Sequence, residues 1–157
     1  MACCDDITRP TVPSARSHIN SVVLHSTWES DAVTVMDSPE ASDFVAFFAR
    51  NDHLGLVIPY EYLEVSHNYE PDFLVRLANG VTVLLEVKGH ERDPEQNNSK
   101  HQAARQWVSA VNNMKDEVFG QWAFLVCRDV EMLLPELAKL VGKTAAPFSL
   151  KKAGQLV

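Results

Sequence analysis

The feature that most constrains the fold of this chain is a predicted β-hairpin centred on Asn79-Gly80. Two apolar runs rich in β-branched residues, 73–77 and 81–87, flank this dipeptide, which is a strong short-range hairpin signal. A three-residue turn over 78–80 places Phe73 opposite Leu85 and gives the hairpin one uniformly apolar face. A two-residue turn would mix apolar and polar side chains on both faces, so we reject it.

This register places two carboxylates opposite each other on the second face of the hairpin. Asp72 faces Glu86, and Lys88 lies on the same side as Glu86 because side chains alternate along a strand. Two facing carboxylates repel each other unless a cation lies between them. We therefore expect a divalent ion with oxygen ligands, Mg²⁺ in the first place and Mn²⁺ as a substitute.

Asp72, Glu86 and Lys88 form the pattern Pro-Asp, a spacer, and Glu-x-Lys. Hydrolysis of a phosphodiester needs a metal that acidifies a water and neutralises developing charge, with a cation beside that water. In this interpretation Asp72, Glu86 and the backbone carbonyl of Val87 are metal ligands, and Lys88 positions or deprotonates the water. The alternative is a structural one, a surface cluster of ion pairs worth about 0–1 kcal/mol each.

Four residues outside the hairpin are further candidates. Glu29 completes a capping box with Ser26 and is either only a helix cap or also a third acid near the metal. Lys100 lies near the expected start of a helix, on the stripe that faces the sheet, and either meets phosphate or a carboxylate or extends past the core edge. His90 and His101 flank the loop beside the site and are candidates for substrate contact.

The pattern of the remaining chain predicts an α/β fold. We expect a flexible segment over 1–17, a nuclease-like domain over 18–144 and a tail over 145–157. Helical periodicity and β-rich runs predict the elements inside the domain. They are a strand within 19–24, a helix at 27–36, a hairpin of 44–49 with 54–60, the central hairpin, a loop at 89–98, a helix at 99–114, a strand at 122–127 and a helix at 135–141. For the arm at 44–49, a partly helical conformation is the alternative.

Composition narrows the possible functions. The 157 residues carry a net charge of −7, which argues against holding nucleic acid by bulk electrostatics. No apolar run is long enough for a membrane helix, and three cysteines give no disulfide framework, so we expect a cytoplasmic protein without membrane contact. The histidines and cysteines lack the spacing of a zinc site. Gly142-Lys143-Thr144 lacks the earlier glycine of a phosphate-binding loop, so no ATP site is expected.

Beyond these residues, a series of sequence blocks resembles the C-terminal endonuclease domain of type III restriction enzyme restriction (Res) subunits, which belongs to the PD-(D/E)XK nuclease superfamily. The resemblance spans about residues 18–142 and includes Pro71-Asp72 and Glu86-Val87-Lys88. The blocks occur in the same order in both, at 18–24, 28–29, 49–55, 58–60, 69–73, 85–89, 100, 107–112 and 119–122.

The resemblance implies a three-layer α/β/α sandwich with a central mixed sheet, as in restriction endonucleases. It also implies a magnesium-dependent endonuclease acting on DNA, with Asp72, Glu86 and Lys88 as catalytic residues and Glu29 as the family's helical acid. One departure is Met36-Asp37, where the family tends to have Leu-Glu.

The second departure is the absence of the ATP-dependent, helicase-like motor that precedes this domain in type III enzymes. The chain therefore resembles the nuclease end alone, and we expect a helicase/ATPase subunit and a methyltransferase or recognition subunit as partners. The alternative function is a catalytically silent DNA-binding or assembly module that retains the nuclease fold.

Overall fold

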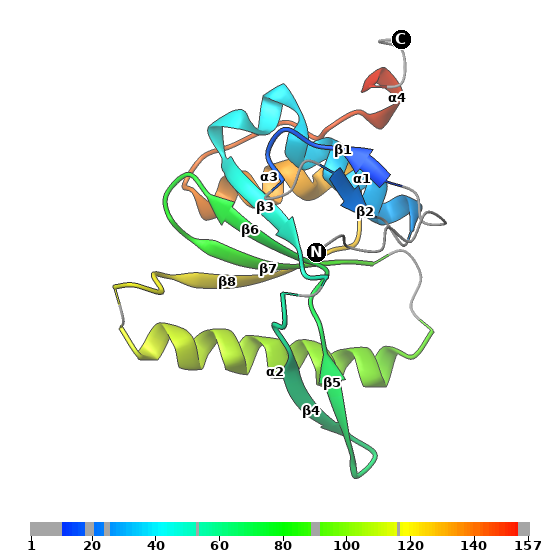
Figure 1. Cartoon of the computed structure of the whole chain (residues 1–157), viewed down its shortest axis with the longest axis vertical. Helices are drawn as coiled ribbons and strands as arrows, with labels where there is room; N and C mark the ends of the chain where they lie inside the picture. Colours follow the sequence, from blue (N-terminus) through cyan, green and yellow to red (C-terminus); the bar gives the residue numbers. More distant parts are fainter. Residues whose placement is uncertain are drawn as a thin grey trace, which may run out of the picture.

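The protein has a mixed α/β fold built on a four-stranded mixed sheet (Figure 1). The computed structural model describes residues 11–17, 21–23, 26–52, 54–88, 92–115 and 117–153. The strands lie in the order β3-β6-β7-β8; β7 and β8 are parallel and the other neighbours antiparallel. They are β3 (Val45–Arg50), β6 (Phe73–Leu77), β7 (Thr82–Val87) and β8 (Trp122–Cys127).

The central hairpin has the register that the apolar pattern predicts. Phe73 pairs with Leu85 and Val75 with Val83. The turn is closed by a 2.8 Å hydrogen bond from the Leu77 N–H to the Val81 carbonyl, and Gly80 takes the left-handed conformation at φ +86°. A residue with a Cβ would be strained at this position. The hairpin side chains of the predicted apolar face lie in the larger of two cores, all buried except Val81, which is partly buried.

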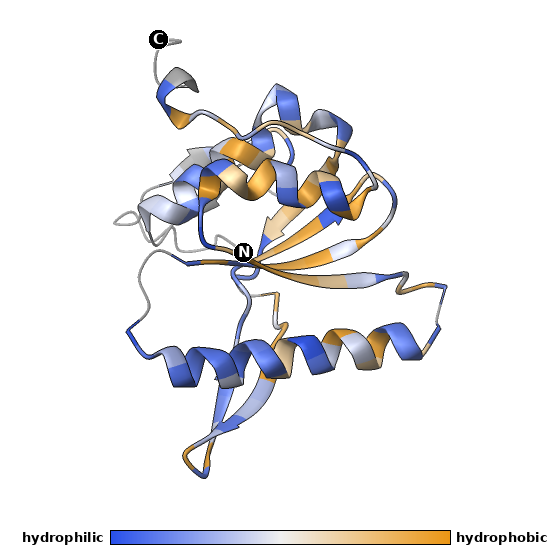
Figure 2. Cartoon of the chain, turned by 180° about the vertical axis from the view of Figure 1, so that it is seen from behind, coloured by the Kyte–Doolittle hydropathy of each residue, from blue (hydrophilic) through white to orange (hydrophobic). Residues whose placement is uncertain are grey.

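Helices cover both faces of this sheet (Figure 1). The larger core packs against α1 (Thr27–Asp37) and α3 (Leu133–Leu140), and the smaller one against α2 (Pro94–Asn113). Figure 2 shows that α2 is mostly hydrophilic, in agreement with its three buried residues, His101, Ala104 and Val108. Within the described residues, none of the helices has the length and apolar character to cross a membrane.

The short elements complete the fold. They are β1 (Thr11–Pro13), β2 (Ser21–Val23), the 3₁₀ helices η1 (Pro39–Asp43) and η2 (Val130–Met132), and α4 (Leu150–Ala153). Residues 11–17, expected to be flexible, contain β1, and the Asp37 carboxylate accepts hydrogen bonds from the N–H groups of Ala15 and Arg16. Phe148, in the expected tail, packs against the larger core. The domain boundaries themselves stay a prediction.

The expected hairpin between 44–49 and 54–60 is wrong. The first arm, β3, pairs with β6, and the second, β4 (Ile58–Tyr62), pairs with β5 (Val65–Tyr69). The β4–β5 hairpin projects from the sheet and packs along α2 (Figure 1). Only Tyr69 is buried in β5, so this strand lacks the alternating apolar pattern that would reveal it.

The helix expected at 99–114 begins earlier, inside the expected loop. The Asp93 carboxylate caps α2 by accepting a 3.0 Å hydrogen bond from the Gln96 N–H. Pro94 follows at the first helical position, where its missing N–H costs nothing.

The other expected elements are found close to their predicted bounds. The strand at 122–127 is confirmed, the helix expected at 27–36 is confirmed as α1, and α3 begins at Leu133, just before Pro135. Only part of the strand expected within 19–24 lies in the described residues, as β2.

Candidate active site

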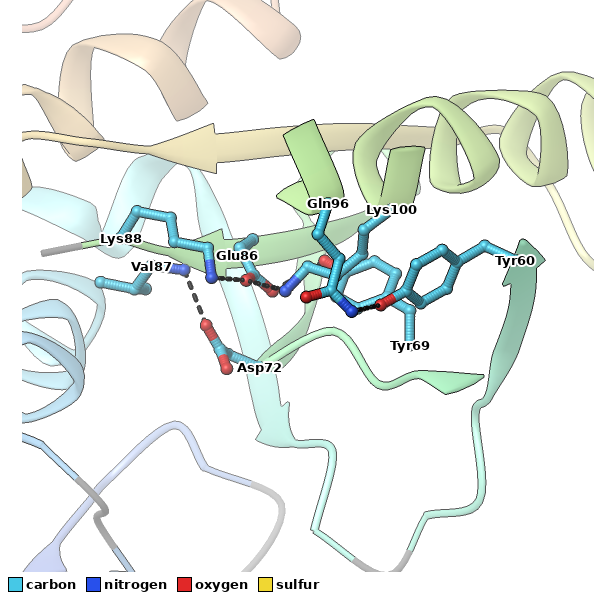
Figure 3. A network of polar contacts seen from close by, with 8 residues as sticks. All are labelled: Tyr60, Tyr69, Asp72, Glu86, Val87, Lys88, Gln96 and Lys100. Atoms are coloured by element: carbon cyan, nitrogen blue, oxygen red, sulfur yellow. Dashed lines mark hydrogen bonds and ion pairs between the residues drawn. The ribbon is translucent and has the colours of Figure 1, made fainter. Parts of the chain in front are cut away.

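Polar side chains from three elements converge at the end of β7 (Figure 3). Asp72 immediately precedes β6, Glu86 lies near the end of β7, and Lys88 follows that strand. Lys100 reaches the same place from α2. Asp72 and Glu86 are the next opposed positions after the pair Phe73–Leu85, as the predicted register requires. The structure thus brings together three residues that the sequence suggests as catalytic, Asp72, Glu86 and Lys88, and their roles stay a prediction.

Glu86 is the centre of this cluster. Its side chain is 3% exposed, and its Oε1 accepts hydrogen bonds from the Nζ of Lys88 at 2.7 Å and of Lys100 at 2.9 Å. The Tyr69 hydroxyl donates a 2.7 Å bond to Oε2. Burial alone would raise the pKa of Glu86, but the ammonium groups of Lys100 and Lys88 outweigh it and lower the pKa below its usual value. Glu86 is therefore a buried, fully ionised carboxylate at neutral pH.

Asp72 is held differently from Glu86. Its Oδ2 accepts a 2.8 Å hydrogen bond from the Val87 N–H, and among the described residues no group donates to Oδ1. Burial and the charge of Glu86 raise the pKa of Asp72 to about 7. A substantial share of the metal-free carboxyl is therefore protonated at neutral pH. A cation between the two carboxylates would relieve the repulsion that keeps it so.

The backbone at the end of β7 directs a third oxygen toward Asp72. The Lys88 N–H donates to the Cys127 carbonyl of β8 at 2.9 Å, while the Val87 N–H points the opposite way, to Asp72. In an extended strand the N–H and C=O of one residue point to the same edge. The Val87 carbonyl therefore faces the side of Asp72, past the end of β6.

These oxygens suit a hard divalent cation. Two carboxylates and a carbonyl are ligands that Mg²⁺ takes, the remainder of its shell being water. Within the described part of the chain, no group of three or more His, Cys, Asp or Glu side chains is arranged to hold a metal ion. The set here has only two such side chains, Asp72 and Glu86, with the Val87 carbonyl as the third donor. These three donors suit Mg²⁺ or Mn²⁺, and the binding of such an ion at this site stays a prediction.

The two lysines on Glu86 differ in their environments. Burial alone would lower the pKa of Lys88, but its hydrogen bond to Glu86 and the charge of Glu86 raise the pKa above its usual value. Burial lowers the pKa of Lys100, against the opposing charge of Glu86. The Lys100 ammonium also lies 4.6 Å from the centre of the Tyr69 ring. Because α2 starts at Pro94, Lys100 stands in its second turn, beyond the first-turn position assumed from the sequence.

Glu29 caps α1 and also lies near the site. The Ser26 hydroxyl accepts a 3.2 Å hydrogen bond from the Glu29 N–H, as the capping box predicts. The Glu29 carboxylate forms a 3.4 Å ion pair with Arg50, and both side chains are 10% exposed. The charge of Glu29 adds to the effects that raise the pKa of Asp72, so the two acids lie within electrostatic range. A third-acid role for Glu29 stays a prediction, since the carboxylate is already paired.

The structure places one of the two candidate histidines in the core. His101 is 3% exposed, and its ring lies 5.6 Å from that of Phe124, centre to centre. Burial lowers the pKa of His101, so the ring is neutral at pH 7. His101 belongs to α2, and its ring packs against Phe124 of β8. The expected contact of His101 with substrate stays a prediction. His90 lies outside the described residues.

Sequence reasoning missed several residues that build the site. Tyr69 lies in strand β5, which the sequence pattern does not predict. Gln96 was assigned to a loop, yet its Nε2 donates a 2.9 Å hydrogen bond to the Tyr60 hydroxyl (Figure 3). That bond ties the first turn of α2, one turn before Lys100, to β4. Arg50, the ion-pair partner of Glu29, lies at the end of β3. Its position depends on the pairing of β3 with β6, which the sequence does not predict.

The raised pKa of Asp72 predicts a pH-dependent stability difference in the metal-free protein. The unfolded carboxyl ionises near pH 4 and the folded one near pH 7. The contribution of Asp72 to native stability therefore falls as the pH rises between these values. Asp72→Asn, which does not titrate and can still accept from the Val87 N–H, should gain about 2–3 kcal/mol relative to the wild type between pH 4 and pH 8.

Urea denaturation in the presence of a chelator measures this difference at the two pH values. Asp43→Asn, at an exposed position, is the matched control and should show no comparable change. An equal free-energy difference between wild type and Asp72→Asn at both pH values would show that Asp72 is not a partly buried carboxyl repelled by Glu86.

Comparisons of the chain with protein-family models, curated proteins and solved structures give no match. The resemblance to the type III nuclease domain therefore rests on the sequence blocks themselves. The geometry of the site is an independent observation, since it follows from the register of the hairpin and the packing of α2.

Proposed function

We propose that this chain is a metal-dependent endonuclease domain that hydrolyses DNA phosphodiester bonds. It would correspond to the C-terminal nuclease domain of a type III restriction enzyme. Its fold would then be the three-layer α/β/α sandwich of restriction endonucleases. The observation that carries the proposal is the convergence of the facing Asp72 and Glu86 carboxylates with the Lys88 ammonium. Helices on both faces of a mixed sheet, with the site at the end of a central strand, support the fold assignment.

The donor set defines what each residue would do in the reaction. Asp72, Glu86 and the Val87 carbonyl would hold Mg²⁺, or Mn²⁺ in its place. When bound, this ion supplies Lewis acidity that makes a water more acidic and neutralises charge on the phosphate. The raised pKa keeps Lys88 protonated at neutral pH, so Lys88 orients the attacking water and stabilises negative charge. The proton of that water leaves to solvent as its oxygen attacks phosphorus and the opposite P–O bond breaks, and the departing sugar oxygen takes a proton from solvent.

DNA binding would be local, because the net charge of −7 disfavours a broad electrostatic grip. A helicase/ATPase subunit and a methyltransferase or recognition subunit remain proposed partners that would deliver DNA and supply sequence recognition. A cytoplasmic location belongs to the same proposal.

Conversion of supercoiled plasmid to nicked or linear DNA tests this function. We expect cleavage by the wild type with Mg²⁺ or Mn²⁺, none with a chelator, and none by Asp72→Asn despite its intact fold. Binding of supercoiled, linear and single-stranded DNA without cleavage under either metal would instead identify the silent module. Cleavage by Asp72→Asn at the wild-type rate would refute the assignment of Asp72.

A further inference from the structure

Both oxygens of Glu86 are engaged by donors of the protein itself. Oε1 accepts from Lys88 and Lys100 together, and Oε2 accepts from the Tyr69 hydroxyl. A carboxylate oxygen has two acceptor directions, and both of those on Oε1 are taken. Glu86 therefore cannot bind a metal ion through Oε1 while both ammonium groups remain in place.

Lys100 is the ammonium group that can leave. Lys88 stands two positions from Glu86 along one strand, and its backbone is fixed by the 2.9 Å bond to Cys127. Lys100 reaches Glu86 from a separate element, α2, with a side chain that is 18% exposed. It also has a second favourable contact with the face of the Tyr69 ring, 4.6 Å from the ring centre. The Gln96–Tyr60 hydrogen bond holds the first turn of α2 on β4, so we expect the side chain of Lys100 to move while the helix stays in place.

We propose that Lys100 is a stand-in cation that occupies Glu86 in the metal-free protein and is displaced when a divalent ion binds. This inference rests on the proposed metal site. Among the residues described above, two carboxylates (Glu29 and Glu86) and the partly protonated Asp72 already lie near three cations (Arg50, Lys88 and Lys100). A dication adds two positive charges and repels Lys100. The displaced ammonium is then available to the phosphate of the substrate, so that metal binding prepares the site for DNA.

Titration of Mn²⁺ into the full chain, followed by calorimetry or by the EPR signal of free Mn²⁺, tests this displacement without measuring cleavage. Lys100→Met removes the competing charge but keeps a long side chain beside Tyr69. Its affinity for Mn²⁺ should rise about tenfold, the effect of relieving one nearby like charge. Lys100→Arg, which keeps the charge, should show no increase. Lys139→Met, on α3 and therefore against the other face of the sheet, is the matched control and should leave the affinity unchanged.

The outcomes separate this inference from the proposed function. Tighter binding in Lys100→Met alone supports displacement. Unchanged or weaker binding in Lys100→Met, with a thermal transition like that of the wild type, overturns the displacement while the metal site stands. Absence of saturable Mn²⁺ binding in the wild type overturns the metal site, and the displacement with it.

Discussion

Lys88→Met should slow metal-dependent DNA cleavage by roughly 10²–10³-fold, the usual effect of removing one group that stabilises developing charge at a reacting centre. The ammonium of Lys88 lies 2.7 Å from Glu86 Oε1, beside the proposed metal ligands. Replacing Lys88 by methionine removes this ammonium group but keeps the proposed metal ligands and the ion pair of Lys100 with Glu86. The affinity for Mn²⁺ should therefore persist or increase while the rate falls.

The rate is measured as initial nicking of supercoiled plasmid at saturating metal, with Lys139→Met again as the control. Because Lys88 is only partly buried, the thermal transition of the variant should remain close to that of the wild type. Cleavage by Lys88→Met at the wild-type rate would remove Lys88 from the reaction and with it the catalytic interpretation of the cluster.

Glu86→Ala should destabilise the metal-free protein by about 3 kcal/mol, because it leaves two partly buried ammonium groups and a buried hydroxyl without their common partner. The cost exceeds that of an exposed ion pair because Glu86 is 2% exposed and accepts three hydrogen bonds. The charge of Glu86 repels the Asp72 carboxylate and raises its pKa. Removing Glu86 ends this repulsion, which offsets part of the lost stability.

Urea denaturation at pH 7 with a chelator gives the free energy of unfolding. Glu70→Ala, an exposed acid close by in the sequence, serves as the control and should change it by less than about 0.5 kcal/mol. If Glu86→Ala is no more destabilising than Glu70→Ala, Glu86 is not the buried centre of this polar network.

The parts of the fold that sequence could predict are those fixed by local pattern. The register of the β6–β7 hairpin follows from its apolar face and its turn, and it places Asp72 opposite Glu86 with Lys88 alongside. The helix α1 follows from its cap, and β8 from its continuous apolar run. In each case the residues that decide the structure are neighbours in sequence.

The rest depends on contacts between distant segments. β3 pairs with β6 across more than twenty residues, and nothing in its own sequence selects that partner over β4. β5 is polar because most of its side chains stay exposed on the projecting hairpin. The sequence therefore does not predict that Tyr69 donates a hydrogen bond to Glu86. It likewise does not predict the ion pair between Arg50 and Glu29. The start of α2 differs from the prediction because the polar run 89–98 favours a loop, whereas Asp93 and Pro94 together are a helix-start signal.

Titration of Mn²⁺ into the wild type and into Asp72→Asn tests the central claim, a divalent-metal site formed by Asp72, Glu86 and Val87, most directly. We expect saturable binding by the wild type and an affinity lowered at least 10–100-fold in Asp72→Asn, since the substitution removes a charged ligand while keeping its shape. Equal affinities in the two proteins, or no saturable binding in the wild type, would contradict a metal site at the end of β7.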